Sequence, residues 1–398
     1  MLPCRLIKKD LRMSPELAYI LITPYTIQKS RTGGIIARLL SRTNLELVGA
    51  RMLVATKEFT EKYAENIEEL TSWNNKDIAK LLGSYVRENF APHNNKHHRI
   101  MMLLFKGKNA RQKIYNIVGK LCSEIKTGET IRNTYSDYIL NNDGSIRYFE
   151  PAVIASPPYE GLEKTINVFT DLMHSQPNII NKPLMSGKIS GKRTLVIIKP
   201  DNWRYPSSRP GNIIDMLSKA GLRIVGCKLY HMSVKEALEF YGPVRNALRE
   251  KIAPRIGKQS KKVLEETLKI ILDDSVCNIL TESVGYEFAD DQFSRLVEFM
   301  AGTRPEECSS DDLAAPGIVK CLILIYQGED AVEKIRAVLG PTDPTKAPGG
   351  TIRRDFGTDI MVNTAHASDS FENAEREMEI VKIEENNIYQ IIKDHYKL

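Results

Sequence analysis

One histidine near the end of the chain stands just ahead of a predicted helix. Residues 363–377 read Asn-Thr-Ala-His-Ala-Ser-Asp-Ser-Phe-Glu-Asn-Ala-Glu-Arg-Glu, so the histidine is His366. Apolar residues recur at helical spacing from Phe371, and either Asp369 or Ser370 can cap the first turn. Free amides and the helix dipole at such an end favour an anion. Because an imidazole is mostly uncharged near neutral pH, the pattern predicts a nucleophile beside an anion site, which suggests a phosphohistidine.

A histidine at a helix start is more often a hydrogen-bonded structural residue, so this chemistry needs cations from elsewhere in the chain. Phosphoryl transfer depends mostly on positioning and on positive charge around the migrating group. Lys199 follows the apolar run 195–198 and is expected at the end of a strand. Arg336 and Arg353 supply guanidinium groups, each of which can bind two phosphate oxygens at once. Taken alone, each of these residues would be an ordinary surface cation.

Taken in order, five short motifs resemble those of nucleoside diphosphate kinases, at nearly the spacing of that family. The resemblance covers about residues 193–381. It implies a phosphotransferase that moves the terminal phosphate of a nucleoside triphosphate to a nucleoside diphosphate, by a ping-pong route through phospho-His366. The motifs are Lys199-Pro-Asp, Gly211-Asn-Ile-Ile, Arg336 with Leu339-Gly-Pro-Thr, Gly350-Thr-Ile-Arg, and the His366 segment.

The resemblance also implies a catalytic set around the histidine. His366 is the expected nucleophile, and a phosphate on imidazole is a high-energy group, as reversible exchange requires. Ser368 and Glu377 match the residues that fix the direction and tautomer of the histidine ring. Tyr241 matches a tyrosine that supports the pocket of the nucleophile.

A second set is expected to bind the nucleotide. The resemblance implies that Lys199 reaches the terminal phosphate and that Arg336 and Arg353 grip the phosphates. Thr342 would offer a hydroxyl to the phosphates, and Asn363 an amide to the sugar. We expect Mg²⁺ to bridge phosphate oxygens of ATP and other nucleoside di- and triphosphates rather than to sit in a protein cage. No carboxylate cluster in the sequence suggests a dedicated metal site.

Two positions depart from the family pattern. Ala367 stands where the family has a glycine after the histidine, which is a small change unless a positive φ is required. The family places a phenylalanine under the nucleotide base, whereas the alignment here gives Gln292, with Phe293 next to it. Either base stacking is weaker in this protein, or Phe293 takes over that role.

A third departure is an insertion at about residues 243–291. Its first part is basic, and its second part is apolar and acidic. We interpret its apolar stripe, which recurs at helical spacing, as core or as a contact between subunits rather than as a cofactor site. The resemblance implies a homo-oligomer. The stripe consists of Leu264, Leu268, Ile271 and Leu272.

The chain also contains an internal repeat. Residues 107–132 laid without gaps on residues 328–353 give nine identities in 26 positions, against about one or two by chance. Each half reads strand-helix-strand-strand-helix-strand, which predicts an α+β fold of two ferredoxin-like domains, each with an antiparallel four-stranded sheet covered by helices. The predicted parts are a basic N-terminal lead (1–17), a first domain (18–174), a linker (175–192) and a second domain (193–398) with a helical insertion.

The first copy has lost the residues that matter most. Ile154 falls on the position of His366, Thr23 on that of Lys199, and Tyr115 on that of Arg336. Leu121 replaces Thr342, whereas Arg132 and Tyr63 keep the residue types of the second copy. An isoleucine cannot carry a phosphate, so the first domain is predicted to be an inactive structural partner.

Composition sets the broader class of protein. The chain has 398 residues, a formal net charge of +6 and six widely spaced cysteines, a pattern that fits neither a disulfide framework nor a zinc site. We expect a cytoplasmic protein without a signal peptide or membrane span, and its charge density does not favour nucleic-acid binding. The alternative is a catalytically weak nucleotide-binding or regulatory module whose basic insertion holds an acidic partner or nucleic acid.

Overall fold

The computed structural model describes residues 15–69, 76–122, 127–158, 162–174, 176–184, 191–385 and 387–397. Two compact units are present, one formed by Met1–Leu184 with Asn386–Leu398 and the other by Met185–Glu385. Most of the predicted N-terminal lead and a large part of the predicted linker lie outside the described residues. Within the described part of the chain, no helix has the length and apolar character needed to cross a bilayer.

A four-stranded antiparallel sheet forms the centre of the first unit. Its strand order is β2-β3-β1-β6. The elements of this unit are β1 (Glu16–Ile22), α1 (Pro24–Gln28), α2 (Thr32–Arg42), β2 (Glu46–Leu53), α3 (Lys57–Glu69), α4 (Lys76–Phe90), β3 (Ile100–Gly107), α5 (Ala110–Val118), α6 (Ile131–Tyr135), β4 (Asp137–Leu140), β5 (Ile146–Glu150), β6 (Val153–Ala155), α7 (Leu162–Met173) and α16 (Ile388–Tyr396).

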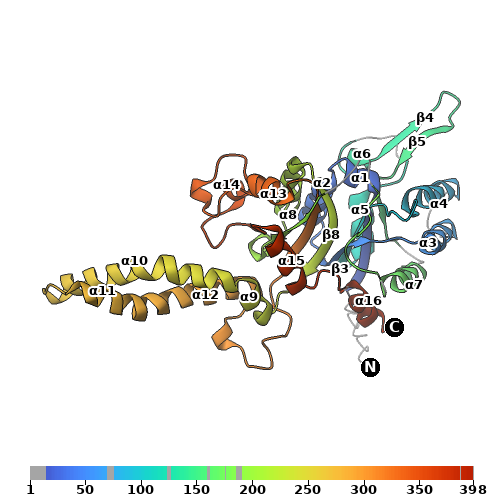
Figure 1. Ribbon diagram of the computed structural model, residues 1–398. Helices are drawn as coiled ribbons and strands as arrows, with labels where there is room; N and C mark the ends of the chain where they lie inside the picture. Colours follow the sequence, from blue (N-terminus) through green and yellow to red (C-terminus); the bar gives the residue numbers. More distant parts are fainter. Residues whose placement is uncertain are drawn as a thin grey trace, which may run out of the picture. The chain divides into compact units, whose positions relative to one another are not determined.

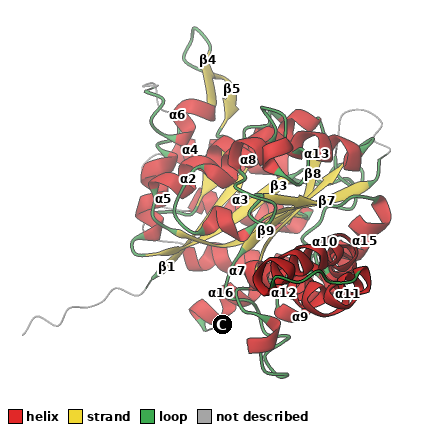
Figure 2. Ribbon diagram, turned by 90° about the vertical axis from the view of Figure 1, so that its left-hand side faces the viewer, coloured by secondary structure: helices red, strands yellow, loops and turns green. Residues whose placement is uncertain are grey.

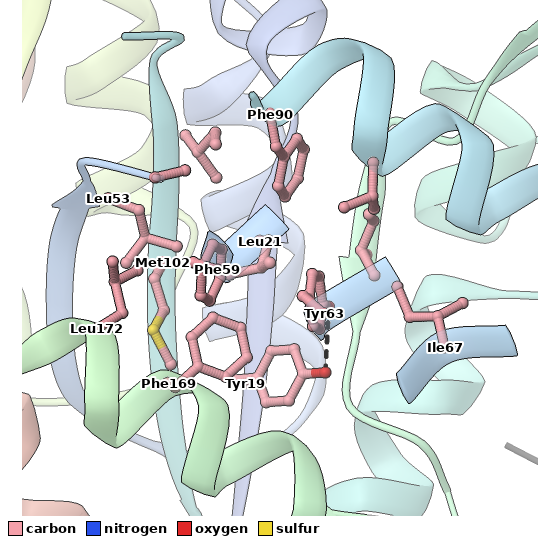
Figure 3. Packing of buried hydrophobic residues seen from close by; sticks show 14 of the residues in the cluster. Tyr19, Leu21, Leu53, Phe59, Tyr63, Ile67, Phe90, Met102, Phe169 and Leu172 are labelled. Atoms are coloured by element: carbon pink, nitrogen blue, oxygen red, sulfur yellow. Dashed lines mark hydrogen bonds between the residues drawn. The ribbon is translucent and has the colours of Figure 1, made fainter. Parts of the chain in front are cut away.

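Aromatic side chains fill one side of this first sheet (Figure 3). Tyr19 of β1 packs against Phe169 of α7, with ring centroids 5.0 Å apart. Its hydroxyl lies 3.2 Å from that of Tyr63 on α3, so two buried phenols satisfy each other. Tyr63, which the sequence aligned with Tyr241, is therefore a core residue here.

The last helix of the chain belongs to a different unit from the one predicted. Residues 193–398 were expected to form the second domain, but α16 packs in the first unit. Its Ile388 and Ile392 are fully buried in the aromatic cluster of that unit. Helix α4 and the β4–β5 hairpin were also not predicted.

The second unit contains a sheet of the same kind, with strand order β10-β7-β9-β8. Both units are thus ferredoxin-like α+β folds, as predicted. The elements of this unit are β7 (Arg193–Ile198), α8 (Arg209–Leu217), β8 (Arg223–Tyr230), α9 (Val234–Phe240), α10 (Gly242–Leu268), α11 (Asp274–Leu280), α12 (Tyr286–Ala301), β9 (Cys321–Gln327), α13 (Ala331–Leu339), α14 (Ile352–Phe356), β10 (Ala365–Ala367) and α15 (Phe371–Ile380).

Both faces of this second sheet are covered. Five consecutive residues of β7, 194–198, are buried, and successive strand residues point to opposite faces. In Figure 2, α8 and α13 lie on one side of the strands and α15 on the other. A side chain at the end of β7 or β10 can therefore reach a site that helices enclose.

The insertion folds as a helical hairpin that projects away from the sheet of its unit (Figure 1). Helix α10 has 27 residues, so it extends for about 40 Å. The returning segment lies close against α10 because each side has a glycine at the contact. A Cβ at Gly257 of α10 would collide with Thr281, and a Cβ at Gly285 of the returning segment would collide with Ala253.

The predicted apolar stripe of the insertion is not a core. Leu264 and Leu268 are 36% and 56% exposed, and Ile271 is 97% exposed. Helix α10 ends at Leu268, and Lys269 takes a left-handed conformation, so the helical spacing does not continue to the last two stripe residues. The interpretation as core is therefore wrong for this chain, and the interpretation as a subunit contact stays a prediction.

The strand pairing around His366 in the second unit has an equivalent in the first unit. Leu21 pairs with Ile154 in the first unit, and Ile197 pairs with His366 in the second. The residue before each short edge strand has a positive φ, at Ala152 and Thr364. Ile154 and His366 therefore occupy equivalent places on equivalent strands.

Candidate active site

A cavity of about 1160 Å³ opens in the second unit. Segments from the whole length of this unit contribute to its wall, including α10, α12, α13 and the loops around β10. Its lining contains eight of the ten residues that the sequence assigned to catalysis or nucleotide binding. These are Lys199, Tyr241, Arg336, Thr342, Arg353, Asn363, His366 and Glu377.

His366 lies at the centre of β10, and its side chain is 21% exposed. Its Nε2 atom lies 3.0 Å from Oε2 of Glu377, and the hydroxyl of Ser368 donates to the same oxygen at 2.6 Å. A carboxylate only accepts hydrogen bonds, so the proton of the neutral imidazole belongs on Nε2. This leaves the lone pair on Nδ1, which makes Nδ1 the nucleophilic atom.

Local structure explains how the carboxylate reaches the ring. Ser370 caps α15 by accepting from the backbone amide of Asn373. Glu377 lies two turns into that helix and is only 4% exposed. The cap predicted at Asp369 or Ser370 is thus made by Ser370, and the helix presents a buried carboxylate to the strand before it.

Two aromatic rings border the histidine. The ring centroids of Phe240 and Tyr241 lie 5.1 and 6.0 Å from that of His366, both edge-on. Burial, followed by the charge of Glu377, raises the pKa of Tyr241 well above its ordinary value. Its buried hydroxyl has no hydrogen-bond partner among the described residues, so it remains a neutral donor beside the cavity.

Lys199 extends from the end of β7 into the same cavity. Its ammonium group donates to Oδ1 of Asn363 at 2.8 Å, and both side chains are buried. Burial, with a contribution from the nearby charge of Arg353, lowers the pKa of Lys199 to about 8. The amide nitrogen of Asn363 donates to the carbonyls of Ile360 and Thr342, so this side chain holds the lysine as well as lining the cavity.

The two predicted arginines differ in how firmly they are held. Arg353 donates to the carbonyls of Gly340 and Ala365 at 2.9 and 3.0 Å. Burial, with a contribution from the charge of Arg336, lowers its pKa to about 10. Arg336 itself is exposed on α13 and lines the cavity, as does the exposed Thr342. The cavity therefore combines one buried, hydrogen-bonded guanidinium with one exposed guanidinium.

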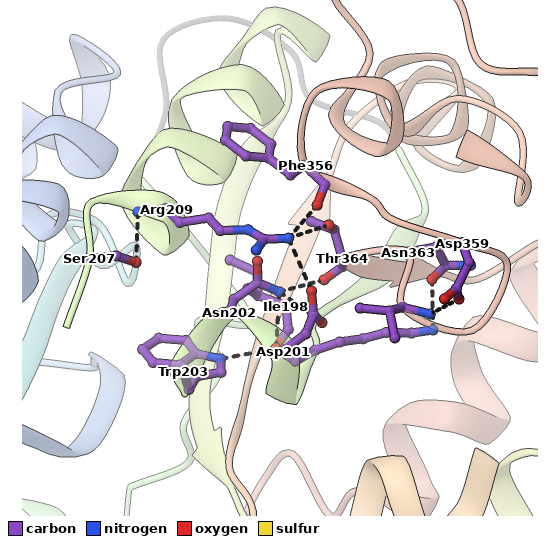
Figure 4. A network of polar contacts seen from close by, with 12 residues as sticks. Ile198, Asp201, Asn202, Trp203, Ser207, Arg209, Phe356, Asp359, Asn363 and Thr364 are labelled. Carbon is purple, nitrogen blue, oxygen red and sulfur yellow. Dashed lines mark hydrogen bonds and ion pairs between the residues drawn. The ribbon is translucent and has the colours of Figure 1, made fainter. Parts of the chain in front are cut away.

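A polar network that the sequence reasoning missed supports the strand of the histidine (Figure 4). Arg209 donates to the carboxylate of Asp201, the hydroxyl of Thr364 and the carbonyl of Phe356. Asn202 donates to the carbonyl of Thr364 at 2.8 Å. Burial raises the pKa of Asp201, although Arg209 acts in the opposite direction. No local sequence pattern marks Arg209, because two of its three partners, Phe356 and Thr364, lie 147 and 155 residues away.

Phe293, which was predicted to stack on the nucleotide base, does not line the cavity. Phe293 is 4% exposed within α12 and is absent from the lining, whereas its neighbour Gln292 is present. Successive helix residues point about 100° apart, so Phe293 faces away from the direction of Gln292. The assignment of base stacking to Phe293 stays a prediction. The cavity wall contributed by α10 contains the aliphatic side chains of Val244, Leu248 and Ile252.

Among the described residues, no group of three or more histidine, cysteine or acidic side chains could hold a metal ion. The cavity instead offers cations around a nucleophilic nitrogen. Such an arrangement can receive a phosphoryl group and stabilise its charge.

Comparison with known proteins agrees with this chemistry. The sequence profile described as Nucleoside diphosphate kinase matches residues 192–252 and 314–386. The nucleoside diphosphate kinase of Helicobacter pylori (strain P12) is 32% identical over 187 residues, which cover 47% of this chain and 92% of that protein. The enzyme of Chlamydia muridarum is 31% identical over 183 residues, covering 46% and 86%.

Solved structures give matches of the same extent. An NDP kinase from Pyrobaculum aerophilum is 30% identical, with a TM-score of 0.34, and covers 48% of this chain and 95% of its own. The nucleoside diphosphate kinase of Aquifex aeolicus is 25% identical, with a TM-score of 0.30, and covers 50% and 99%. The sequence matches span nearly the full length of the relatives and about half of this chain. This chain therefore belongs to the nucleoside diphosphate kinase family.

Proposed function

We propose that the second unit transfers the terminal phosphate of a nucleoside triphosphate to a nucleoside diphosphate through a phosphohistidine at His366. The observation that carries the proposal is the contact between Nε2 of His366 and the buried carboxylate of Glu377. It fixes the tautomer and leaves Nδ1 unprotonated in a cavity that also contains Lys199 and Arg353.

The reaction has two steps that mirror each other. The lone pair of Nδ1 attacks the γ-phosphorus of the donor, the bond to the bridging oxygen breaks, and the nucleoside diphosphate leaves. A terminal phosphate oxygen of the acceptor diphosphate then attacks the phosphohistidine, and the P–N bond breaks. The lysine and the arginines would stabilise negative charge in both steps. Mg²⁺, bound through the phosphates, would neutralise part of that charge and arrive with the nucleotide.

Labelling tests this proposal directly. Wild-type protein incubated with ATP labelled at the γ-phosphate should acquire an acid-labile, base-stable label, and a diphosphate acceptor should remove it. His366→Asn should take up no label. His231→Asn is the matched control, because this histidine of the same unit is exposed and lies outside the cavity lining. Labelling of His366→Asn at the wild-type level would contradict the proposal.

We also propose that the first unit is a degenerate duplicate of the second. Three structural features support the duplication. Arg132 donates to the carbonyls of Gly119 and Val153 as Arg353 does to Gly340 and Ala365. Asn109 and Asp330 both have a φ of 53° ahead of equivalent helices. Both second strands have a bulge, at Leu47/Gly49 and at Ile224/Gly226.

A buried carboxylate supports the inactivity of this first copy. Thr23, at the position of Lys199, donates to Glu150 at 2.8 Å, and Tyr85 donates to the other oxygen at 2.6 Å. Glu150 is 3% exposed, and burial raises the pKa of its carboxyl. An acidic side chain thus lies next to the place where the second unit has its lysine, and it offers a phosphate no positive charge. A phosphohistidine found in the first unit after treatment with ATP would overturn this proposal.

The alternative, a regulatory module that binds nucleotide without turnover, makes a different prediction from the same experiment. Such a module would bind ATP and acquire no label. Basic side chains on α10 favour it, and the intact set around His366 opposes it.

A further inference from the structure

A buried lysine lies outside the cavity but is connected to it through one helix. Lys228 is on β8, and its side chain is only 3% exposed. It does not line the cavity, and the proposed reaction assigns it no role. Burial of an ammonium group is costly, so this position needs an explanation.

The ammonium group of Lys228 binds the end of α15. It donates to the carbonyl of Val381 at 3.1 Å and to that of Lys382 at 2.6 Å. These carbonyls directly follow the last helical residue, Ile380, where a helix leaves acceptors unpaired and carries the negative end of its dipole. Burial lowers the pKa of Lys228 to about 8, so the group is still mostly charged near neutral pH.

Charged side chains of neighbouring elements also act on this lysine. Glu236 and Glu385 favour its charge, and Lys382 opposes it. Lys382 in turn lies 3.6 Å from Glu236, which reduces the repulsion. The ring of Tyr230 lies 4.8 Å from the ammonium group. The lysine therefore donates to two backbone carbonyls while charged and aromatic side chains surround it.

The same helix carries the carboxylate that binds the histidine. Glu377 precedes Val381 by about one turn, and its Oε2 atom accepts hydrogen bonds from Nε2 of His366 and from the hydroxyl of Ser368. A shift of α15 along its axis would move this oxygen away from Nε2 of the ring. The chain between the lysine contact and the histidine contact is short and helical, so movement at one end is transmitted to the other.

The first unit has a buried cation at the position equivalent to Lys228. Arg51 follows the bulge of β2 as Lys228 follows that of β8, and it is fully buried. It donates to the carbonyls of Gln176 and Pro177, just past the end of α7. In each unit, a cation at this place thus binds carbonyls that follow the helix after the edge strand, and an arginine can do so.

We propose that Lys228 is a positioning residue for the phosphotransfer reaction: it fastens α15 to the sheet and thereby holds the carboxylate of Glu377 against His366. The proposal rests on the proposed function. In the second unit, the contact made by Lys228 would affect catalysis, whereas the corresponding contact in the first unit would serve only the stability of the fold.

The test compares four variants by steady-state kinetics and by single-turnover labelling. Lys228→Met should lower kcat about tenfold with little change in KM, because the phosphate-binding side chains are untouched and only the histidine is misplaced. Lys228→Arg should restore kcat. Arg51→Met, the matched control, removes the same kind of contact from the first unit and should leave kcat unchanged. In a Glu377→Gln background, Lys228→Met should have almost no further effect.

Two results would overturn the inference: a wild-type kcat in Lys228→Met, or an equally large effect of this substitution in the Glu377→Gln background. The second result would mean that the lysine acts on the fold and not through the carboxylate. If Lys228→Met does not fold, Lys228→Gln, which keeps a shorter donor, is judged by the same two criteria. Absence of any label in the wild-type protein would instead refute the proposed function.

Discussion

Alkaline pH should weaken nucleotide binding by removing the charge of one buried lysine. Lys199 has a pKa of about 8 because burial and the charge of Arg353 disfavour its ammonium form. With that value, about nine-tenths of the side chain is charged at about pH 7 and about one-tenth at about pH 9. If binding requires the charged form, kcat/KM should fall about tenfold over this interval, since kcat/KM reports on the free enzyme.

The same titration of Lys199 should increase the free energy of unfolding as the pH rises, whereas nucleotide binding becomes weaker. The pKa of Lys199 in the folded protein lies below the ordinary value of 10.5, so between about pH 8 and about pH 10.5 the unfolded chain binds more protons than the folded one. The contribution of this lysine to the free energy of unfolding therefore increases as the pH rises through that window. Weaker nucleotide binding with no loss of fold distinguishes this effect from alkaline unfolding.

Two lysines of the second unit share a pKa of about 8, so the assignment needs a control. The measurement is the profile of kcat/KM from about pH 6.5 to about pH 9.5. Lys199→Arg, if it retains activity, should lose the alkaline limb because a guanidinium stays charged. Lys228→Arg should keep the limb. A flat wild-type profile up to about pH 9.5, or a limb that disappears only in Lys228→Arg, would refute the reasoning.

Two further predictions concern helices α10 and α12. Replacing Lys251, Arg255 and Lys258 together by glutamine should lower kcat/KM several-fold at low ionic strength and leave it unchanged at high ionic strength. These exposed cations have no ion pair with any described residue and lie within about a Debye length of the cavity wall on α10. Phe293→Ala should cost about 3–5 kcal/mol of stability in urea unfolding, because the ring is buried; Gln292→Ala should instead change KM with little effect on stability.

The fold was predictable from the sequence because its elements have strong local patterns. Apolar runs such as 195–198 become strands buried on both faces, and the ungapped repeat already aligned Arg132 with Arg353. A cap at Asp369 or Ser370 was expected from the local sequence, and Ser370 makes it. The resemblance carried by short motifs implied a shared site for Lys199 and His366, and both residues line one cavity. Each of these inferences needed only residues close in sequence or an order of motifs along the chain.

The remaining features depend on contacts that no local pattern encodes. Helix α16 has an ordinary amphipathic sequence, and only packing of Ile388 shows that it belongs to the first unit. Which face of α12 borders the cavity depends on helical phase, so Gln292 and Phe293 could not be distinguished from the sequence. Arg209 binds Thr364 across 155 residues, a separation that hides the partner.

Comparison of the two units separates what an arginine does for the fold from what it can do for a phosphate. Arg132 keeps its two bonds to carbonyls in a unit whose equivalent of the histidine is Ile154. Those bonds therefore serve the fold, and Arg353 must make them as well. The Nε atoms of both arginines are buried without partners among the described residues, so this feature alone does not indicate a ligand. What distinguishes Arg353 is its cavity, where its charge lies with Lys199 around one imidazole; replacing it would change stability and binding together, whereas the pH response of Lys199 tests binding alone.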